Sequence, residues 1–286
     1  MTDFFGYSTR SVSSPHFRID MLENAGPRIV RLVPAGTQVN LLAEIPNVHW
    51  PSPGGEFYPL GGHRLWAGPE SPELTYMPDH LNAILEEVPN GYCVRHEDHF
   101  NGYHYQRQIE VSLDQSAPKA TLIHELKNLG TAPLRVLPWA VTQFRMGGKA
   151  HLPLNKAPAD AHALLPNRNV VLWPYTDLHE SRLHLNNESI EIDAIPREDP
   201  LKVGVFNAEG WAAIEFEEGW VVIKRFAPSL PEEYADFNTN LQCYVRDVFI
   251  ELETLGKLST LQPGQTVTHV EKWEVQKGSL ASLGLG

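Results

Sequence analysis

Cysteine is scarce in this 286-residue chain, which contains only Cys93 and Cys243. Disulfide frameworks are typical of small secreted domains, and a chain of this length can bury a large core without one. Both cysteines lie within alternating apolar stretches. We therefore expect two packed thiols in a reducing compartment.

Long apolar runs and basic clusters are also missing. No stretch approaches the roughly 18 apolar residues that indicate a membrane-spanning helix, and the first residues do not resemble a signal peptide. Asp and Glu number 35 against 23 Lys and Arg, and the formal net charge is −12. Such a surface disfavours nucleic acid and anionic membranes as partners. The expected location is the cytoplasm.

The chain lacks the short motifs of several enzyme classes. It contains no GxSxG nucleophile elbow, no phosphate-binding P-loop and no GxGxxG segment after a strand. Hydrolase, NTPase and dinucleotide-binding functions are therefore not supported, and no cofactor is expected.

Three neighbouring histidines, His96, His99 and His104, are spaced in a way that invites a metal interpretation. On a strand, however, His96 and His99 point to opposite faces. No second ligand pair completes a closed zinc site. We expect an exposed histidine loop and no metal.

What the chain does contain is short alternating runs separated by turns. Residues 102–113 place one set of side chains on a common face: Tyr103, Tyr105, Arg107, Ile109, Val111 and Leu113. Residues 211–217 and 220–226 flank Glu218-Gly219, which predicts a hairpin. Two further strands are predicted over 246–255 and 266–275, joined by a turn at residues 262–264.

Helical periodicity is weak, and 23 prolines argue against long helices. Short helices are predicted over 78–87 and 157–165. Residues 148–201 are predicted to form long connections across one mouth of the fold, with one strand over 169–173. The prediction for residues 1–286 is therefore one all-β domain, a large antiparallel β-sandwich with a few short helices.

The segment 61–70, Gly-Gly-His-Arg-Leu-Trp-Ala-Gly-Pro-Glu, concentrates residues suited to binding a sugar. Glycines let a backbone approach a ligand closely, and His63 exchanges protons near neutral pH. Arg64 donates paired hydrogen bonds, and Trp66 offers a flat apolar face. Glu70 ends the segment and is included among the substrate-binding candidates. The alternative is a turn with an exposed histidine and arginine.

Two carboxylates share one face of a strand near the C-terminus. Val248, Ile250 and Leu252 alternate with Glu251 and Glu253. On a concave, partly dry face, one of the two carboxyl pKa values would rise and that group could act as a general base. The alternative is a solvated outer face that pairs with Lys or Arg.

The strand 137–144 places Trp139 and Gln143 on one face, where they could stack on a sugar and hydrogen-bond to it. A core position for Trp139 is the alternative. His124 lies between Leu122 and Leu126 on an apolar face, which favours a core histidine.

Several segments together resemble the aldose 1-epimerase, or galactose mutarotase-like, superfamily, and in particular stand-alone bacterial domains related to it. The resemblance spans roughly residues 18 to 276. Its main segments are 26–32, 61–70, 124–128, 137–140, 251–256, 261–264 and 269–273.

The resemblance implies a supersandwich with a sugar site in the concave face of one sheet. It also implies a glutamate base in a Leu-Glu-Thr context, which Glu253 matches, with Glu251 next in line. His63 is the loose match to one family histidine. The family's second histidine, on a His-x-Tyr-Phe strand, is absent from residues 139–144, and His124 could replace it only from the site face.

The expected ligand is a small carbohydrate. One hypothesis is an anomer-interconverting isomerase that uses Glu253 as base and His63 as acid, with Arg64, Trp66, Glu70, His124, Trp139, Gln143 and Glu251 binding the substrate. The alternative is a non-catalytic sugar or glycan binding module. A lyase or hydrolase built on the same sandwich is less favoured, since no catalytic domain is attached. The sequence does not indicate the oligomeric state.

Overall fold

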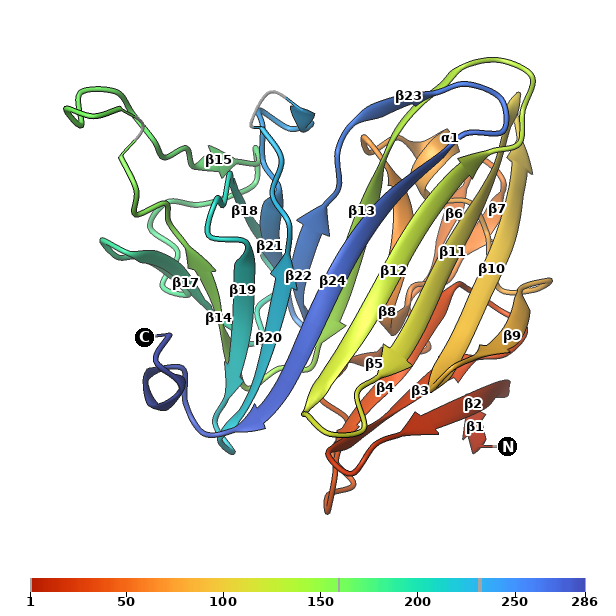
Figure 1. The fold of residues 1–286 in the computed structure, drawn as a ribbon, viewed down its shortest axis with the longest axis horizontal. Helices are drawn as coiled ribbons and strands as arrows, with labels where there is room; N and C mark the ends of the chain where they lie inside the picture. The colour runs from red at the N-terminus through yellow and green to blue at the C-terminus, as the bar shows by residue number, and fades with distance from the viewer. Residues whose placement is uncertain (1, 159, 231–232, 286) are drawn as a thin grey trace.

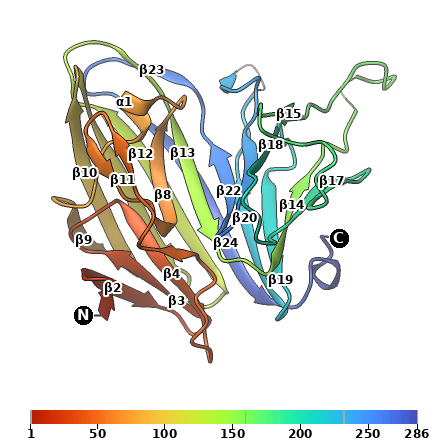
Figure 2. The same cartoon turned by 180° about the vertical axis from the view of Figure 1, so that it is seen from behind.

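The computed structural model describes residues 2–158, 160–230 and 233–285. Two large antiparallel sheets face each other, and Figures 1 and 2 show them from opposite sides. Strands β12 and β24 face the viewer in Figure 1, and β8 and β13 do so in Figure 2. None of the helices in the described residues is long and apolar enough to cross a membrane.

The first sheet carries the candidate site. Its strands, in spatial order, are β1 (Thr2–Phe4), β2 (Tyr7–Ser13), β3 (Phe17–Leu22), β4 (Arg28–Pro34), β8 (Leu60–Gly68), β13 (Leu134–Phe144), β22 (Ile250–Leu255), β21 (Leu241–Val245), β18 (Leu201–Val205) and β15 (Val171–Leu172). Short strands β5 (Glu44–Ile45) and β23 (Ser259–Leu261) pair with β8 and β13.

The second sheet covers the inner face of the first. Its order is β16 (Leu183–Leu185), β17 (Ser189–Asp193), β14 (Gly148–Pro153), β19 (Trp211–Phe216), β20 (Trp220–Phe226), β24 (Thr266–Lys277), β12 (Lys119–Asn128), β11 (Tyr103–Leu113), β10 (Gly91–Phe100) and β9 (Ile84–Val88). A separate hairpin pairs β6 (Trp50–Ser52) with β7 (Gly55–Phe57).

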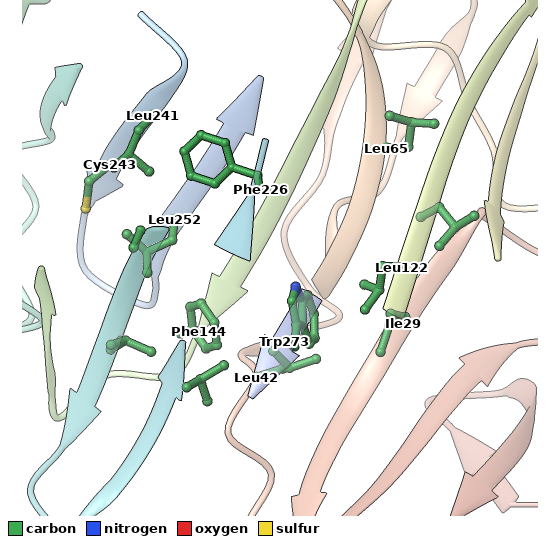
Figure 3. Close-up of a cluster of buried hydrophobic side chains, with 14 of the residues drawn as sticks. Ile29, Leu42, Leu65, Leu122, Phe144, Phe226, Leu241, Cys243, Leu252 and Trp273 are labelled. Atoms are coloured by element: carbon green, nitrogen blue, oxygen red, sulfur yellow. The ribbon is translucent and has the colours of Figure 1, made fainter. Parts of the chain in front are cut away.

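The main core lies between the two sheets. Figure 3 shows side chains from both, including Leu65, Phe144 and Leu252 from the first sheet and Leu122 and Trp273 from the second. Alternate residues of each strand point into this layer, because successive side chains on a strand face opposite ways. The predicted all-β antiparallel sandwich is therefore confirmed.

Several strand predictions agree with the structure. Residues 105, 107, 109, 111 and 113 of β11 are buried on one face, as the alternation indicates. Strands β19 and β20 form the predicted hairpin. The strands predicted over 246–255 and 266–275 are present as β22 and β24. They lie in different sheets, and β23 lies between them in the chain. The three histidines lie on the paired strands β10 and β11 and not in a loop.

Both predicted helices are wrong. Residues 84–88 pair with β10 as strand β9, while the Asp79 carboxylate binds the buried Arg28 instead of capping a helix. The described residues of 157–165 form turns, because the Asp160 carboxylate accepts backbone N–H groups locally and so competes with helix formation. The one short α-helix in the described residues is α1, Pro72–Thr75, capped by Ser71.

The segment predicted to cross one mouth of the fold is only partly a loop. Residues 148–201 include strands β14 and β17, which extend the second sheet, as well as the short β15 and β16. The described residues 154–158 and 160–170 are irregular and lead into β15 (Figure 1).

Candidate functional site

A cavity of about 460 Å³ opens on the outer, concave side of the first sheet. Its size lies within the range typical of small-molecule sites. Six residues singled out from the sequence line it together: Arg64, Trp66, Glu70, Trp139, Gln143 and Glu251. They come from β8, the loop after it, β13 and β22.

Strand β8 divides the 61–70 segment between two faces. Arg64 and Trp66 line the cavity, whereas His63 points inward, where its Nδ1 lies 2.9 Å from Thr142 Oγ1 and its Nε2 lies 2.7 Å from His124 Nε2. Adjacent residues on a strand cannot serve one face. His63 therefore cannot act with Arg64 on one sugar, and it is not carried forward as the acid.

The two glycines that precede His63 do not make room for a ligand. They have φ values of +93° and +72°, and a Cβ on Gly61 or Gly62 would lie 2.0 Å from the carbonyl oxygen of Ala43 or Ile29. The glycines instead allow β8 to pack closely against neighbouring backbone.

His124 lies in the same interior layer and is fully buried. Its Nδ1 lies 3.1 Å from the carbonyl oxygen of His269. The core-histidine interpretation therefore describes its position, and it does not reach the cavity.

The two strand carboxylates occupy different depths. Glu251 lines the cavity. Glu253 lies beneath the residues that line the cavity, and none of its surface is exposed. Trp139 Nε1 and Lys202 Nζ donate to Glu253 Oε2 at 2.8 and 2.9 Å, and both of these residues line the cavity. Glu253, the first candidate for the base from the sequence, is thus covered by the two side chains that donate hydrogen bonds to it.

Lys202 is held as a charged group at the cavity wall. Its ammonium lies over the rings of Trp139 and Trp173, 4.8 and 4.7 Å from their centroids. Burial opposes its charge, but the charge of Glu253 and the hydrogen bond to it prevail, and the pKa of Lys202 is raised. An ammonium has three N–H donors, and one is used on Glu253.

A hydrogen-bond relay crosses the cavity floor. Arg64 Nη2 donates to Gln143 Oε1, and Gln143 Nε2 donates to Glu251 Oε1 at 2.7 Å. Burial, followed by the charge of Glu253, raises the pKa of Glu251 to about 8. Glu251 therefore changes charge close to neutral pH, where a general acid or base is most effective.

Several buried polar atoms at the site have no hydrogen-bond partner among the described residues. They are Arg64 Nε and Nη1, Trp66 Nε1 and Glu253 Oε1. Burial lowers the pKa of Arg64 to about 9, so its guanidinium stays charged at neutral pH. Unpaired buried donors are costly unless a ligand or water satisfies them.

One wall of the cavity is aromatic. The rings of Trp66 and Trp139 meet edge to face with centroids 5.1 Å apart, and Tyr76 contacts Trp66 at 5.4 Å. The Tyr76 hydroxyl donates to Glu70 Oε1, which places that carboxylate at the rim. Such surfaces suit the C–H faces of a sugar ring, while the polar floor suits its hydroxyls.

The sequence interpretation missed several lining residues: Lys202, Tyr76, Tyr175, Tyr244, Arg246, Phe249, His49 and Trp50. Lys202 had a signal, because it is a single lysine within the apolar run 201–205. Tyr76, Tyr175 and Phe249 come from loops, and Trp50 and Tyr244 from the short strands β6 and β21, so their position at the cavity depends on the whole fold. Lys224 and Arg225 of β20 do not line the cavity: Lys224 points between the sheets and Arg225 pairs with Glu274.

Behind the cavity, a polar cluster is buried between the sheets. Lys224 Nζ lies 2.9 Å from Glu271 Oε1, and Trp273 Nε1 donates to Glu271 Oε2 at 2.7 Å. The same ammonium donates to Thr142 Oγ1 of β13 at 2.8 Å and to the Leu252 carbonyl of β22 at 2.9 Å. This cluster therefore fixes the backs of the two strands that carry Gln143 and Glu251.

Three members of this cluster could in principle hold a metal. Ligand atoms of His63, His124 and Glu271 lie within 4.8 Å of one another. Each of these groups already has a partner, however, since the two histidines hydrogen-bond to each other and Glu271 forms an ion pair with Lys224. A cation there would have to displace an ammonium, so the donor set does not favour a metal.

No family model matches the sequence. No curated protein matches it either. Solved structures do match in fold. A candidate aldose 1-epimerase from Escherichia coli K12 shares 15% identity over 95% of this chain and 100% of that protein, with a TM-score of 0.55.

Two other solved structures match over similar lengths. A galactose mutarotase-like protein from Lactobacillus casei is 11% identical, covering 94% of this chain and 100% of that one, with a TM-score of 0.53. A galactose mutarotase related enzyme from Lactobacillus acidophilus is 9% identical over 95% and 98% of the two chains, with a TM-score of 0.54. The chain thus has the fold of the aldose 1-epimerase and galactose mutarotase-like proteins.

Proposed function

We propose that this chain is a single carbohydrate-binding domain that holds the reducing end of a sugar in the cavity and interconverts its anomers. The observation that carries the proposal is Glu251, a cavity-lining carboxyl whose pKa is raised to about 8 by burial and the charge of Glu253. Aromatic rings and charged donors line the same cavity, with Arg64 against Trp66 and Lys202 against Trp139.

The proposed reaction is general acid–base catalysis. Ionised Glu251 removes the proton from the C1 hydroxyl, the C1–O5 bond breaks as the C1 carbonyl forms, and the Lys202 ammonium gives a proton to O5. The C1–C2 bond then rotates, and the same steps in reverse close the ring and return both protons. No net redox change occurs.

The other residues have positioning roles in this scheme. Gln143 orients Glu251 by donating to Oε1, and Glu253 keeps Lys202 charged and fixed. Arg64 offers unpaired N–H groups to sugar hydroxyls, and Trp66 and Trp139 supply the apolar surface for the ring. This assignment replaces Glu253 by Glu251 as base and His63 by Lys202 as acid.

A second candidate function is sugar binding without turnover. It is favoured by one observation: the Lys202 ammonium is already engaged by Glu253 at 2.9 Å, which opposes proton donation. Exchange NMR of α and β anomers distinguishes the two functions, using D-galactose, D-glucose and their 6-phosphates with and without protein. Faster exchange for one sugar supports the isomerase. Line broadening without faster exchange supports the binding module.

A further inference from the structure

A second groove, of about 570 Å³, lies at the end of the first sheet beside β18. Its lining combines amide, aromatic and proline side chains: Asn155, Ala157, Pro158, Pro166, Asn167, Arg168, Asn169, Phe206, Ala208, Glu209, Phe237 and Asn238. The segments before β15 and before β21 form its walls and lie at the same end of the sheet (Figure 1).

Phe237 is presented to solvent in an unusual way. Its side chain is 87% exposed, and Asp236, Phe237 and Asn238 have φ values of 49°, 57° and 63°. Three successive non-glycine residues in the left-handed region are costly, and for a bulky residue this conformation is a clear outlier. Strain of this kind persists where the surrounding structure enforces it, often at binding sites.

The surrounding structure does enforce it. Asn169 Nδ2 donates to the Phe237 carbonyl at 3.1 Å, and Gln242 Nε2 donates to Asp236 Oδ2 at 3.0 Å. Gln242 is fully buried, and its Oε1 has no partner among the described residues. The exposed ring is therefore mounted on a rigid turn and is not a loose loop tip.

The groove lies further along β18 than the sugar cavity, and the two have no lining residue in common. Gln242, which holds the Phe237 turn, is the register partner of Glu253, which lies beneath the cavity-lining Trp139 and Lys202. On β18, Lys202 lines the cavity and Phe206, just past the end of the strand, lines the groove. The Phe206 ring also contacts Tyr234, which packs in the same aromatic cluster as Trp139.

We propose that this groove is a second sugar subsite, so that the natural ligand is an oligosaccharide whose reducing unit fills the cavity and one of whose further units stacks on Phe237. The inference rests on the proposed function. An exposed aromatic ring beside amides is the chemistry that recognises a sugar, and a rigid ring loses little conformational entropy on binding.

The test is calorimetric titration of the full chain with D-glucose, D-galactose and the malto-, cello- and galacto-oligosaccharides of two to four units. Three proteins are compared: wild type, Phe237→Ala and Phe5→Ala. Phe5 is the matched control, since it is also exposed, at 53%, and has a positive φ of 51°, but it lies at the β1–β2 turn. Phe237→Tyr tests whether any aromatic ring at this position is sufficient for tighter oligosaccharide binding.

One oligosaccharide series is expected to bind wild type at least tenfold more tightly than its monosaccharide. Phe237→Ala should remove this difference while leaving monosaccharide affinity and anomer exchange unchanged, and Phe237→Tyr and Phe5→Ala should keep it. Equal affinity for all chain lengths, or no effect of Phe237→Ala, overturns the subsite whether or not the protein catalyses exchange. Phe237-dependent oligosaccharide binding without exchange supports the subsite and removes the isomerase.

Discussion

Glu251 and Glu253 are two residues apart on β22, yet one lines the cavity and the other is sealed beneath Trp139 and Lys202. The two carboxyls therefore have different tasks. Glu251 is free to meet a sugar and titrates near neutral pH. Glu253 serves as the counter-ion that holds Lys202 at the cavity wall.

Removing Lys202 alone should destabilise the protein strongly. Lys202→Met leaves the Glu253 carboxylate buried with only Trp139 as donor, and breaking a buried pair in this way costs about 3–5 kcal/mol. Urea unfolding of Lys202→Met and of Lys202→Met/Glu253→Gln measures this. The double variant should be more stable than the single one, and equal stability of wild type and Lys202→Met would contradict the pairing.

The pH profile of anomer exchange should follow the ionisation of Glu251. As the base, Glu251 acts only when ionised, and its pKa is raised to about 8. The protein-dependent rate should therefore rise about tenfold per pH unit below 8 and level off above it. A rate that instead falls as the pH rises through 8 would make Glu251 the acid, against the scheme proposed here.

Glu251 should also make the fold less stable at alkaline pH. Its folded pKa lies above the ordinary value of 4.5, so between pH 4.5 and 8 the folded state binds the proton more tightly than the unfolded state does. Stability is then lost as the pH rises, by up to about 1.4 kcal/mol per unit. Glu251→Gln should be more stable than wild type at pH 8, and urea unfolding at pH 5 and pH 8 tests the sign.

The buried histidines have the opposite effect. Burial lowers the pKa of His63 and His124, and it lowers the pKa of His269 to about 3. Below their ordinary value of 6.5, the unfolded state takes up protons that the folded state resists, so stability falls as the pH falls. Urea unfolding of the Glu251→Gln variant between pH 7 and pH 5 measures this effect without the contribution of Glu251. A free energy of unfolding that does not change over this range would contradict the burial of these histidines in the neutral form.

Lys224 should control both stability and the geometry of the site. Lys224→Met leaves the Glu271 carboxylate between the sheets without its cation, an expected loss of about 3–5 kcal/mol, and removes the ammonium that donates to Thr142 and to the Leu252 carbonyl. Lys224→Met/Glu271→Leu should regain much of the stability. The exposed Lys156→Met is the control, since its ion pair with Glu188 is at the surface, where solvent screens it and its loss should change stability little.

Much of the fold follows from local sequence patterns. The two-residue alternation in 102–113 and the hairpin at 218–219 agree with the structure, because one face of each strand must be buried. The helix predicted over 78–87 is wrong, because tertiary partners decided the outcome: Asp79 is drawn into an ion pair with Arg28, and residues 84–88 find a strand partner in β10.

The site was harder to predict from the sequence. Alternation correctly separates Glu251 and Glu253 from the core face. It does not indicate how deeply each carboxylate is buried, because Glu253 is covered by Lys202 and Trp139 from other strands. The same alternation should have separated His63 from Arg64, which are adjacent on β8. Lys202 itself was missed, since its role appears only when β18 pairs with β21, which in turn pairs with the β22 strand that carries Glu253.

The central claim is that Glu251 catalyses anomer exchange in this cavity. The most direct test compares exchange rates by NMR for wild type and Glu251→Gln with the sugar that wild type accelerates, and Glu86→Gln, a surface change, serves as the control. The expected result is a loss of at least 100-fold in acceleration for Glu251→Gln, in line with general-base catalysis, with sugar affinity within about tenfold. Unchanged acceleration in Glu251→Gln would contradict the account.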